Sequence, residues 1–260
     1  MRGTVSLCIL ALALIHPIYA QTGASEMNAG VAAYKSAMYE SAIAHFRKAA
    51  ELNPALVVAH LYLATCYAQM YLPGDESPDN LQQAQNSIAE FKHVLILSPS
   101  PEQRMTAVKG LASLSFNMKR FDDARQYYHQ AVELDPQDAE GYYSLAVIDW
   151  AEAYTPRIEL RQSIGLQPTD EMISSSSCNL LRSMNQEKVE DGILNLHKAI
   201  GIRSDYDDAM AYMNLLYREK AEYECDDLVA RQADLRLADL WVDRTIAVKK
   251  AKAEAATAPH

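Results

Sequence analysis

Two stretches of this chain, 42–54 and 124–136, carry the same pattern and decide the fold. The first reads AIAHFRKAAELNP and the second reads ARQYYHQAVELDP. Each has a small residue, an aromatic residue four positions later, a second small residue three positions after that, and a proline five positions further on. Residues at this spacing share one face of a helix. Proline closes the pattern because it is tolerated only in a helix's first turn.

Two further stretches, 87–99 and 192–204, repeat the pattern less fully, and the last ends in serine instead of proline. The chain has only nine glycines and ten prolines, which favours helices. Partner segments along the chain carry their own small or short residues, at Gly30, Ala64, Ala112, Ala146 and Asn214. Two antiparallel helices can cross closely where small residues face each other and an aromatic ring fills the remaining hole. The sequence therefore predicts an all-helical chain of repeated helical hairpins.

The chain resembles the tetratricopeptide-repeat (TPR) family. Leu63, Ala64 and Tyr67 match the L-G-x2-Y core of that family, and the prolines stand where its repeats end. The resemblance implies an all-α, right-handed superhelical solenoid of about five helix-turn-helix repeats within residues 21–248. We expect these repeats at residues 24–56, 57–101, 105–138, 139–206 and 207–248.

Three repeats, the second, fourth and fifth, are interrupted between their two helices. The interruptions lie at residues 71–80, 150–186 and 222–227. In a solenoid such turns share one edge, where insertions either bind a partner or cap the structure. They can also be tolerated loop growth, because long surface loops have a low entropic cost.

The fourth interruption is rich in helix-forming residues. We expect the first helix of that repeat to break after Trp150 and its second helix to resume near Glu187. Short helices are expected at 156–165 and 173–184, the latter after a start signal at Pro168. A degenerate sixth repeat is the alternative.

The two ends of the chain are expected to differ from the middle. Residues 1–20 read as a secretory signal, with Arg2 before an uncharged run and cleavage after Ala20. An uncleaved anchor is the alternative, but the run is about half the roughly 20 residues that span a bilayer. We therefore expect an exported protein, periplasmic or secreted, with no membrane span in the mature chain. At the other end, residues 249–260 are expected to be a disordered tail.

The charge balance excludes one class of partner. The chain has 24 lysines and arginines against 34 acidic residues, a net charge of −10. An acidic chain without a basic stripe is poorly suited to phosphate backbones, so we expect no nucleic-acid binding.

The cysteines are the main candidates for chemically important residues in this sequence. Cys178 and Cys225 lie in the interruptions of the fourth and fifth repeats, which are neighbours along one edge, so an exported chain can join them in a disulfide. Cys66 is expected to be a buried thiol. Paired acids at 122–123, 207–208 and 226–227 fit helix starts. Motifs typical of metal sites, phosphate loops and nucleophile elbows are absent from the sequence, so we predict no catalytic residue, metal or cofactor.

The family resemblance leaves the groove formed by the first helices as the binding surface. Its expected lining is Met27, Val31, Tyr34, Leu61, Thr65, Lys109, Phe116, Asn117, Tyr143, Val147, Trp150, Leu215 and Arg218. Lys109, Asn117 and Arg218 have the types of the family's carboxylate clamp but do not lie on successive repeats. Aromatic and apolar groove residues instead suit a peptide or helix with hydrophobic anchors. Alternatively, Tyr143 and Trp150 pack against the chain's own insertion.

The resemblance implies an extracytoplasmic scaffold or adaptor, not an enzyme. It would bind peptide or helix segments of partner proteins in the groove or on the insertion edge. One alternative is an accessory factor in secretion, pilus or outer-membrane assembly. Another is a hydrolase hidden in the inserted segments.

Overall fold

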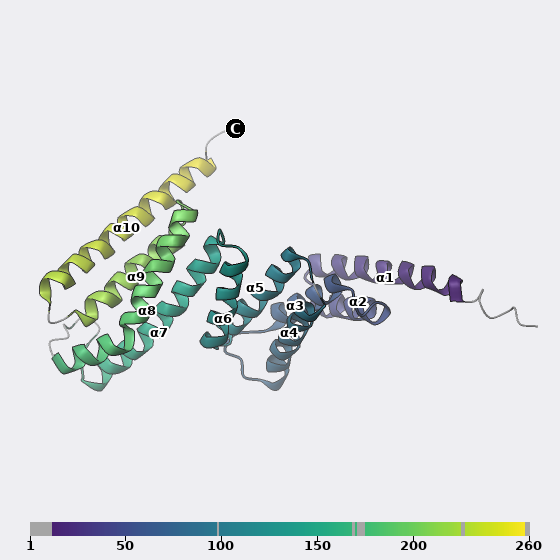
Figure 1. The fold of residues 1–260 in the computed structure, drawn as a ribbon, viewed down its shortest axis with the longest axis horizontal. Coiled ribbons are helices and arrows are strands. Elements are labelled where there is room, and N and C mark those ends of the chain that lie inside the picture. Colours follow the sequence, from purple (N-terminus) through teal and green to yellow (C-terminus); the bar gives the residue numbers. More distant parts are fainter. Residues whose placement is uncertain (1–11, 98, 168–169, 171–174, 225–226, 258–260) are drawn as a thin grey trace, which may run out of the picture. The chain divides into compact units, whose positions relative to one another are not determined.

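The computed structural model of the chain describes residues 12–97, 99–167, 170, 175–224 and 227–257. In this part every regular element is an α-helix (Figure 1). Backbone contacts divide the chain into two compact units, residues 1–127 and 128–260, and each is described by itself. The predicted all-α fold is confirmed.

The first unit contains five helices and the start of a sixth. They are α1 (Leu12–Lys35), α2 (Tyr39–Leu52), α3 (Val57–Met70), α4 (Pro78–Ile96), α5 (Pro101–Asn117) and α6 (Phe121–Leu134), which crosses the boundary between the units. Consecutive helices from α1 to α5 pack against one another, and α3 also contacts α5. The helix pairs follow the order of the predicted repeats.

Small residues and aromatic rings set the helix spacing in this unit, as the repeated pattern predicts. Ala42, Phe46 and Ala49 of α2 are fully buried. A β-carbon added to Gly30 of α1 would lie 2.5 Å from Cε1 of Phe46, so the ring occupies the space that a side chain would need. Close approach of α1 and α2 therefore depends on this glycine.

The interruption of the second repeat is a short ordered loop. Ser77 caps α4, with Pro78 at its first position, so the last three residues of the expected interruption already belong to the helix. The buried Asn80 side chain closes the loop: its Nδ2 donates to the carbonyl oxygens of Leu72 and Asp75, at 2.8 and 2.6 Å. In return, the backbone N–H of Leu72 donates to Oδ1 of Asn80 at 2.7 Å.

The second unit contains the end of α6 and four long helices. They are α7 (Ala139–Ser163), α8 (Ser175–Ile202), α9 (Asp207–Tyr223) and α10 (Leu228–Thr257). Consecutive members of these four pack against one another, and α7 also contacts α9. Their core includes the buried Leu181, Val189, Leu196, Met213 and Trp241.

The fourth repeat differs from the prediction. The expected break after Trp150 was wrong, because α7 runs unbroken to Ser163 and contains Pro156 in its interior. The second helix was expected to resume near Glu187, but α8 begins at Ser175. The interruption therefore lengthens both helices of one hairpin instead of adding short helices or a sixth repeat.

Packing explains why this hairpin continues as two helices. Proline removes one backbone hydrogen bond from a helix interior. One turn before it, Ala153 is fully buried and its carbonyl oxygen accepts a 2.8 Å hydrogen bond from Nδ2 of Asn185 on α8. This contact with α8, which the local sequence does not record, supports α7 in the turn before Pro156.

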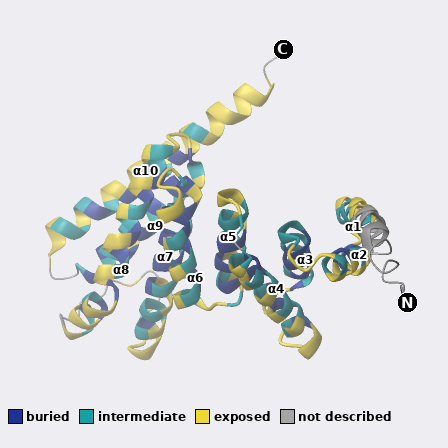
Figure 2. Ribbon diagram, turned by 45° about the vertical axis from the view of Figure 1, so that its right-hand side comes forward, coloured by how far each residue is buried: buried dark blue, intermediate teal, exposed yellow. Residues whose placement is uncertain are grey.

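The C-terminal end also differs from the prediction. Residues 249–257 are helical, as the end of α10, and exposed (Figure 2). Alanine, lysine and glutamate favour helix even without burial. Lys252 adds contacts with the start of α9, donating to Asp207 at 2.6 Å and lying 3.6 Å from Asp205. Residues 258–260 of the expected tail lie outside the described residues.

At the N-terminal end, α1 runs from Leu12 through Ala20 without a break. Most of the expected signal, residues 1–11, lies outside the described residues, and cleavage after Ala20 stays a prediction. Within the part of the chain that the structure covers, no helix is both long and apolar enough to cross a membrane.

Candidate functional site

In the first unit, the predicted groove residues Tyr34, Leu61 and Thr65 have different roles. The Tyr34 ring on α1 lies edge-to-face with Tyr62 of α3, with ring centroids 5.5 Å apart. Tyr62 also stacks on Phe46 at 4.7 Å. Leu61 packs against the core, and the Thr65 hydroxyl donates to the carbonyl of Leu61 at 2.8 Å. Only Tyr34 of these three therefore belongs to a surface of aromatic rings shared by two first helices.

The predicted residues of α5 do not form a compact group. Phe116 is half-buried and its ring lies 5.7 Å from that of Phe121 at the start of α6. Asn117 is exposed, whereas Lys109 is half-buried.

The second unit contains the larger group of rings. Tyr143 and Trp150 of α7 both lie edge-to-face with Tyr212 of α9, each with ring centroids 5.5 Å apart. Tyr143 also contacts Tyr206 at 5.1 Å, and Trp150 contacts Tyr154 at 5.1 Å. We call these five residues the aromatic cluster. Aromatic pairs favour such edge-to-face and offset geometries.

Burial and nearby charges raise the pKa of two tyrosine hydroxyls in the cluster. Burial raises the pKa of Tyr143, and the neighbouring Tyr212 and Asp208 raise it further. Burial followed by the Asp208 carboxylate likewise raises the pKa of Tyr212. Both hydroxyls therefore remain hydrogen-bond donors at neutral pH, beside a negative charge.

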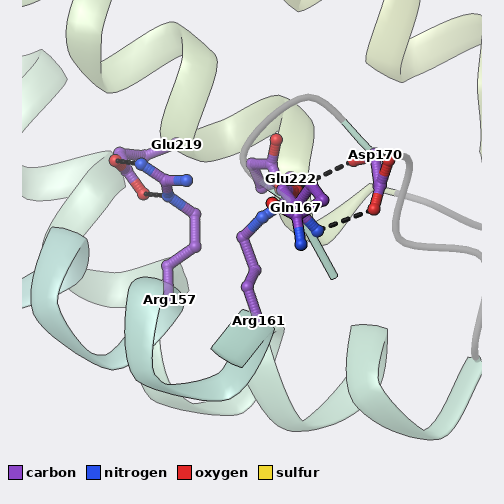
Figure 3. A network of polar contacts seen from close by, with 6 residues as sticks. All are labelled: Arg157, Arg161, Gln167, Asp170, Glu219 and Glu222. Atoms are coloured by element: carbon purple, nitrogen blue, oxygen red, sulfur yellow. Dashed lines mark hydrogen bonds and ion pairs between the residues drawn. The ribbon is translucent and has the colours of Figure 1, made fainter. Parts of the chain in front are cut away.

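A group of charged and polar side chains connects the C-terminal half of α7 to α9 (Figure 3). Arg157 makes a bidentate pair with Glu219 of α9, with Nε at 2.7 Å and Nη2 at 3.0 Å. Arg161, which is 2% exposed, donates to Glu222 at 2.6 Å. Its Nη2 also donates to the backbone carbonyls of Gln167 and Asp170, both at 2.6 Å.

These two arginines tie the hairpin and the turn that follows α7 to α9. Glu219 is only 3% exposed, and burial raises its pKa while the Arg157 guanidinium lowers it. Removing one partner of such a buried pair costs about 3–5 kcal/mol, because the other charge is left unpaired. The group is therefore structural support for the edge on which the fourth and fifth interruptions meet.

Comparison with known proteins agrees with this architecture. The tetratricopeptide-repeat family matches residues 27–56 and 107–138. Among solved structures, MamA is 17% identical with a TM-score of 0.59, covering 93% of this chain and 99% of that one. The chain contains tetratricopeptide repeats, and its fold is that of TPR solenoid proteins. YrrB, described as a TPR protein with an unusual peptide-binding site, is 13% identical with a TM-score of 0.51, covering 87% of this chain and 90% of that one.

No curated protein matches the chain. The TPR fold is that of a protein–protein interaction scaffold and is typical of non-enzymatic proteins. Within the described residues, no three histidines, cysteines and acids are grouped as metal ligands would be.

Three residues, Lys109, Asn117 and Arg218, have the types of a TPR carboxylate clamp, but Arg218 is already paired. Nη2 of Arg218 donates to Asp239 of α10 at 2.7 Å, and its Nε donates to Asn214 at 2.9 Å. Its guanidinium is exposed but already paired within the second unit. Lys109 and Asn117 belong to the first unit. Arg218 is therefore already engaged within its own unit and does not offer a free cation to a carboxylate.

The alternative prediction, that Tyr143 and Trp150 pack against the chain's own insertion, holds only for Trp150. Trp150 contacts Tyr154, which belongs to the lengthened part of α7, whereas Tyr143 contacts Tyr206 and Tyr212 instead. Both predicted rings remain half-buried. Sequence reasoning missed Tyr206 and Tyr212, although Tyr212 lies on a first helix, where a TPR groove residue is expected.

The cysteines occupy different environments. Cys66 is fully buried, and burial raises the pKa of its thiol to about 11, so it is a weak nucleophile. Cys178 is disulfide-bonded, and its Sγ lies 3.2 Å from the carbonyl oxygen of Tyr223. Cys225 lies outside the described residues, and its pairing with Cys178 stays a prediction.

Proposed function

We propose that this chain is an exported TPR adaptor that binds a segment of a partner protein on the aromatic cluster of its second unit. The observation that carries the proposal is the meeting of half-buried Tyr143 and Trp150 from α7 with Tyr212 from α9. Large, rigid rings contribute most of the binding energy at many interfaces. First helices of neighbouring repeats present these rings, as in a TPR groove.

The chemistry of the cluster favours an internal segment with aromatic or aliphatic anchors. Arg218 is already paired with Asp239, so it does not offer a free cation to a C-terminal carboxylate. Asp208 lies close enough to raise the pKa of Tyr143 and Tyr212, and the chain has a net charge of −10. A basic residue beside the hydrophobic anchor would therefore complement the surface.

A peptide-display screen tests the proposal. Peptides selected on the full mature chain should combine an aromatic or aliphatic anchor with lysine or arginine. Trp150→Ala should weaken them by about tenfold or more, as expected for removing a central aromatic anchor. Leu194→Ala, at an exposed residue of α8, is the matched control and should leave affinity unchanged. Equal binding by both variants would count against the cluster as the site.

Export is the second part of the proposal. It is supported by Arg2, the uncharged run after it and the small residue Ala20, which together have the pattern of a secretory signal. An adaptor in an oxidising compartment also fits a chain that carries a disulfide-bonded Cys178.

A further inference from the structure

Helix α10 presents a line of apolar and small residues outside its packed side. The helix packs on α9, and its buried residues are Asp234, Ala238, Trp241 and Thr245. Leu237 and Leu240 lie outside this buried side and are 37% and 42% exposed. The half-buried Ala233 and the exposed Arg244 lie four residues before and after them. Residues spaced by three and four positions share one helix face, and we call these four the α10 stripe.

The order of residues in the α10 stripe makes it self-complementary. In two antiparallel helices related by a twofold axis, residues at equal distances from the axis face each other. With the axis between Leu237 and Leu240, each leucine faces the other one of the second copy, and Ala233 faces Arg244. The small residue leaves room for the long one. The Arg244 guanidinium already lies over the Trp241 ring of its own chain, at 4.5 Å, so only its hydrocarbon stem enters the contact.

Two residues of opposite charge lie along one flank of the stripe. Arg236 and Asp243 are both exposed, and neither has an ion pair or a hydrogen bond to another side chain in the part of the chain that the structure describes. They are seven residues apart, about 10.5 Å along the helix, which is too far for them to pair with each other. Their midpoint lies within about one residue of the midpoint of Leu237 and Leu240, so one twofold axis serves both pairs.

We propose that α10 is a homodimer interface, in which two copies of this chain pair antiparallel through the α10 stripe. The leucines become buried against the second copy. Arg236 of each copy pairs with Asp243 of the other, which gives two symmetric ion pairs. A second copy is the occupant that the residues favour, because the stripe itself supplies both the apolar surface and the charges that match it.

The dimer goes beyond the peptide site and does not depend on it. The stripe lies on α10, whereas the aromatic cluster lies on α7, on α9 and directly before α9. One helix from each copy buries less area than a standard interface of about 1,600 Å², so we expect a dissociation constant in the micromolar range. A dimer carries two aromatic clusters, so a partner with two binding segments would be held more tightly than by one copy.

Analytical ultracentrifugation of the full mature chain from about 1 to 200 µM tests the dimer, and the wild type should pass from monomer to dimer in this range. Leu240→Lys places two charges in the apolar contact and should weaken association by about tenfold or more. Ile246→Lys is the matched control. Ile246 is 60% exposed on the same helix but lies nine residues from Leu237, on the opposite side, so this variant should associate as the wild type does.

Two outcomes of this experiment would overturn the inference. One is a wild type that stays monomeric throughout the range, which would leave the stripe to a different protein. The other is an equal loss of association in Leu240→Lys and Ile246→Lys, which would place the contact elsewhere on the molecule. Circular dichroism of each variant should match the wild type, because both substituted residues are exposed.

Charge exchange tests the antiparallel arrangement. Arg236→Asp and Asp243→Arg should each weaken association several-fold, because each change places like charges opposite one another in both halves of the interface. The double variant restores opposite charges and should recover the wild-type dissociation constant. Added salt should weaken the wild type and the double variant alike. A double variant that associates no better than the single variants would overturn the antiparallel pairing.

Discussion

Gly30 shows how one missing side chain sets the distance between two helices. The Phe46 ring fills the position that a β-carbon would take, at 2.5 Å. Gly30→Val should therefore overpack the α1–α2 contact and reduce the free energy of unfolding by about 1–3 kcal/mol. Urea denaturation would measure the loss. Asn28→Val, at an exposed position on the same helix, is the control, and an equal effect of both changes would mean that the helices do not meet at Gly30.

Glu224 is one source of pH sensitivity in the second unit. Burial, followed by the neighbouring Asp234 carboxyl, raises its pKa to about 7. Lys220 lies between the two acids, 3.3 Å from Asp234 and 3.7 Å from Glu224, but it does not neutralise both. Because the folded chain binds this proton more tightly than the unfolded chain, stability should fall as the pH rises from about 4.5 to 7.

Glu224→Gln should remove this part of the pH dependence, since the amide has no proton to lose. Denaturant midpoints at pH 5 and pH 7.5 would measure the change for wild type and variant. Glu254→Gln, at an exposed residue of α10, should keep the wild-type slope. If the denaturant midpoint of Glu224→Gln changes with pH as that of the wild type does, Glu224 is not the titrating group.

At the scale of elements, the long α7–α8 hairpin depends on attachments to α9. Arg157 and Arg161 supply two of them through Glu219 and Glu222. The expected Cys178–Cys225 disulfide would add a covalent one, since Sγ of Cys178 already lies 3.2 Å from the carbonyl of Tyr223. In the chain-entropy model, closing a loop of this size stabilises by about 3–4 kcal/mol.

Mass mapping of exported protein, alkylated without reductant, tests this disulfide. The Cys178 and Cys225 peptides should be found joined, and Cys66, which is fully buried, should be modified only after unfolding. Cys178→Ser should lower the free energy of unfolding, while Cys66→Ser reports the effect of the substitution without a bridge. Alkylation of both Cys178 and Cys225 in the folded protein would rule the bond out.

At the scale of the whole molecule, the proposed adaptor role depends on export of the chain. Expression of the full sequence in a bacterium with a periplasm should yield a mature chain that begins at Gln21. N-terminal sequencing and intact mass would establish the cleavage. Ala20→Lys, which removes the small residue at the cleavage point, should leave the chain uncleaved. A mature chain that still begins at Met1 or Arg2 would mean that this segment is retained.

The positions of the repeats could be predicted from the sequence because the residues that mark each repeat lie close together in the chain. Ala42, Phe46, Ala49 and Pro54 lie within thirteen residues, and each contributes to one helix face or one turn. The turns repeat as well: Ala37 and Lys119 both adopt a φ of 57°, two residues before the aromatic residue that begins the next helix. Two of the five rings of the aromatic cluster, Tyr143 and Trp150, were predicted for the same reason.

Sequence alone determined that this chain folds as helical hairpins in TPR order, because spacing of small, aromatic and proline residues acts within one or two helices. Tertiary structure decided how far the fourth hairpin extends and which charges are paired. Arg157 and Glu219 are 62 residues apart, and His60 and Glu90 are 30 apart, so no local pattern joins them. Pro156 indicates a helix end by local rules, yet burial of Ala153 against α8 keeps α7 continuous through it.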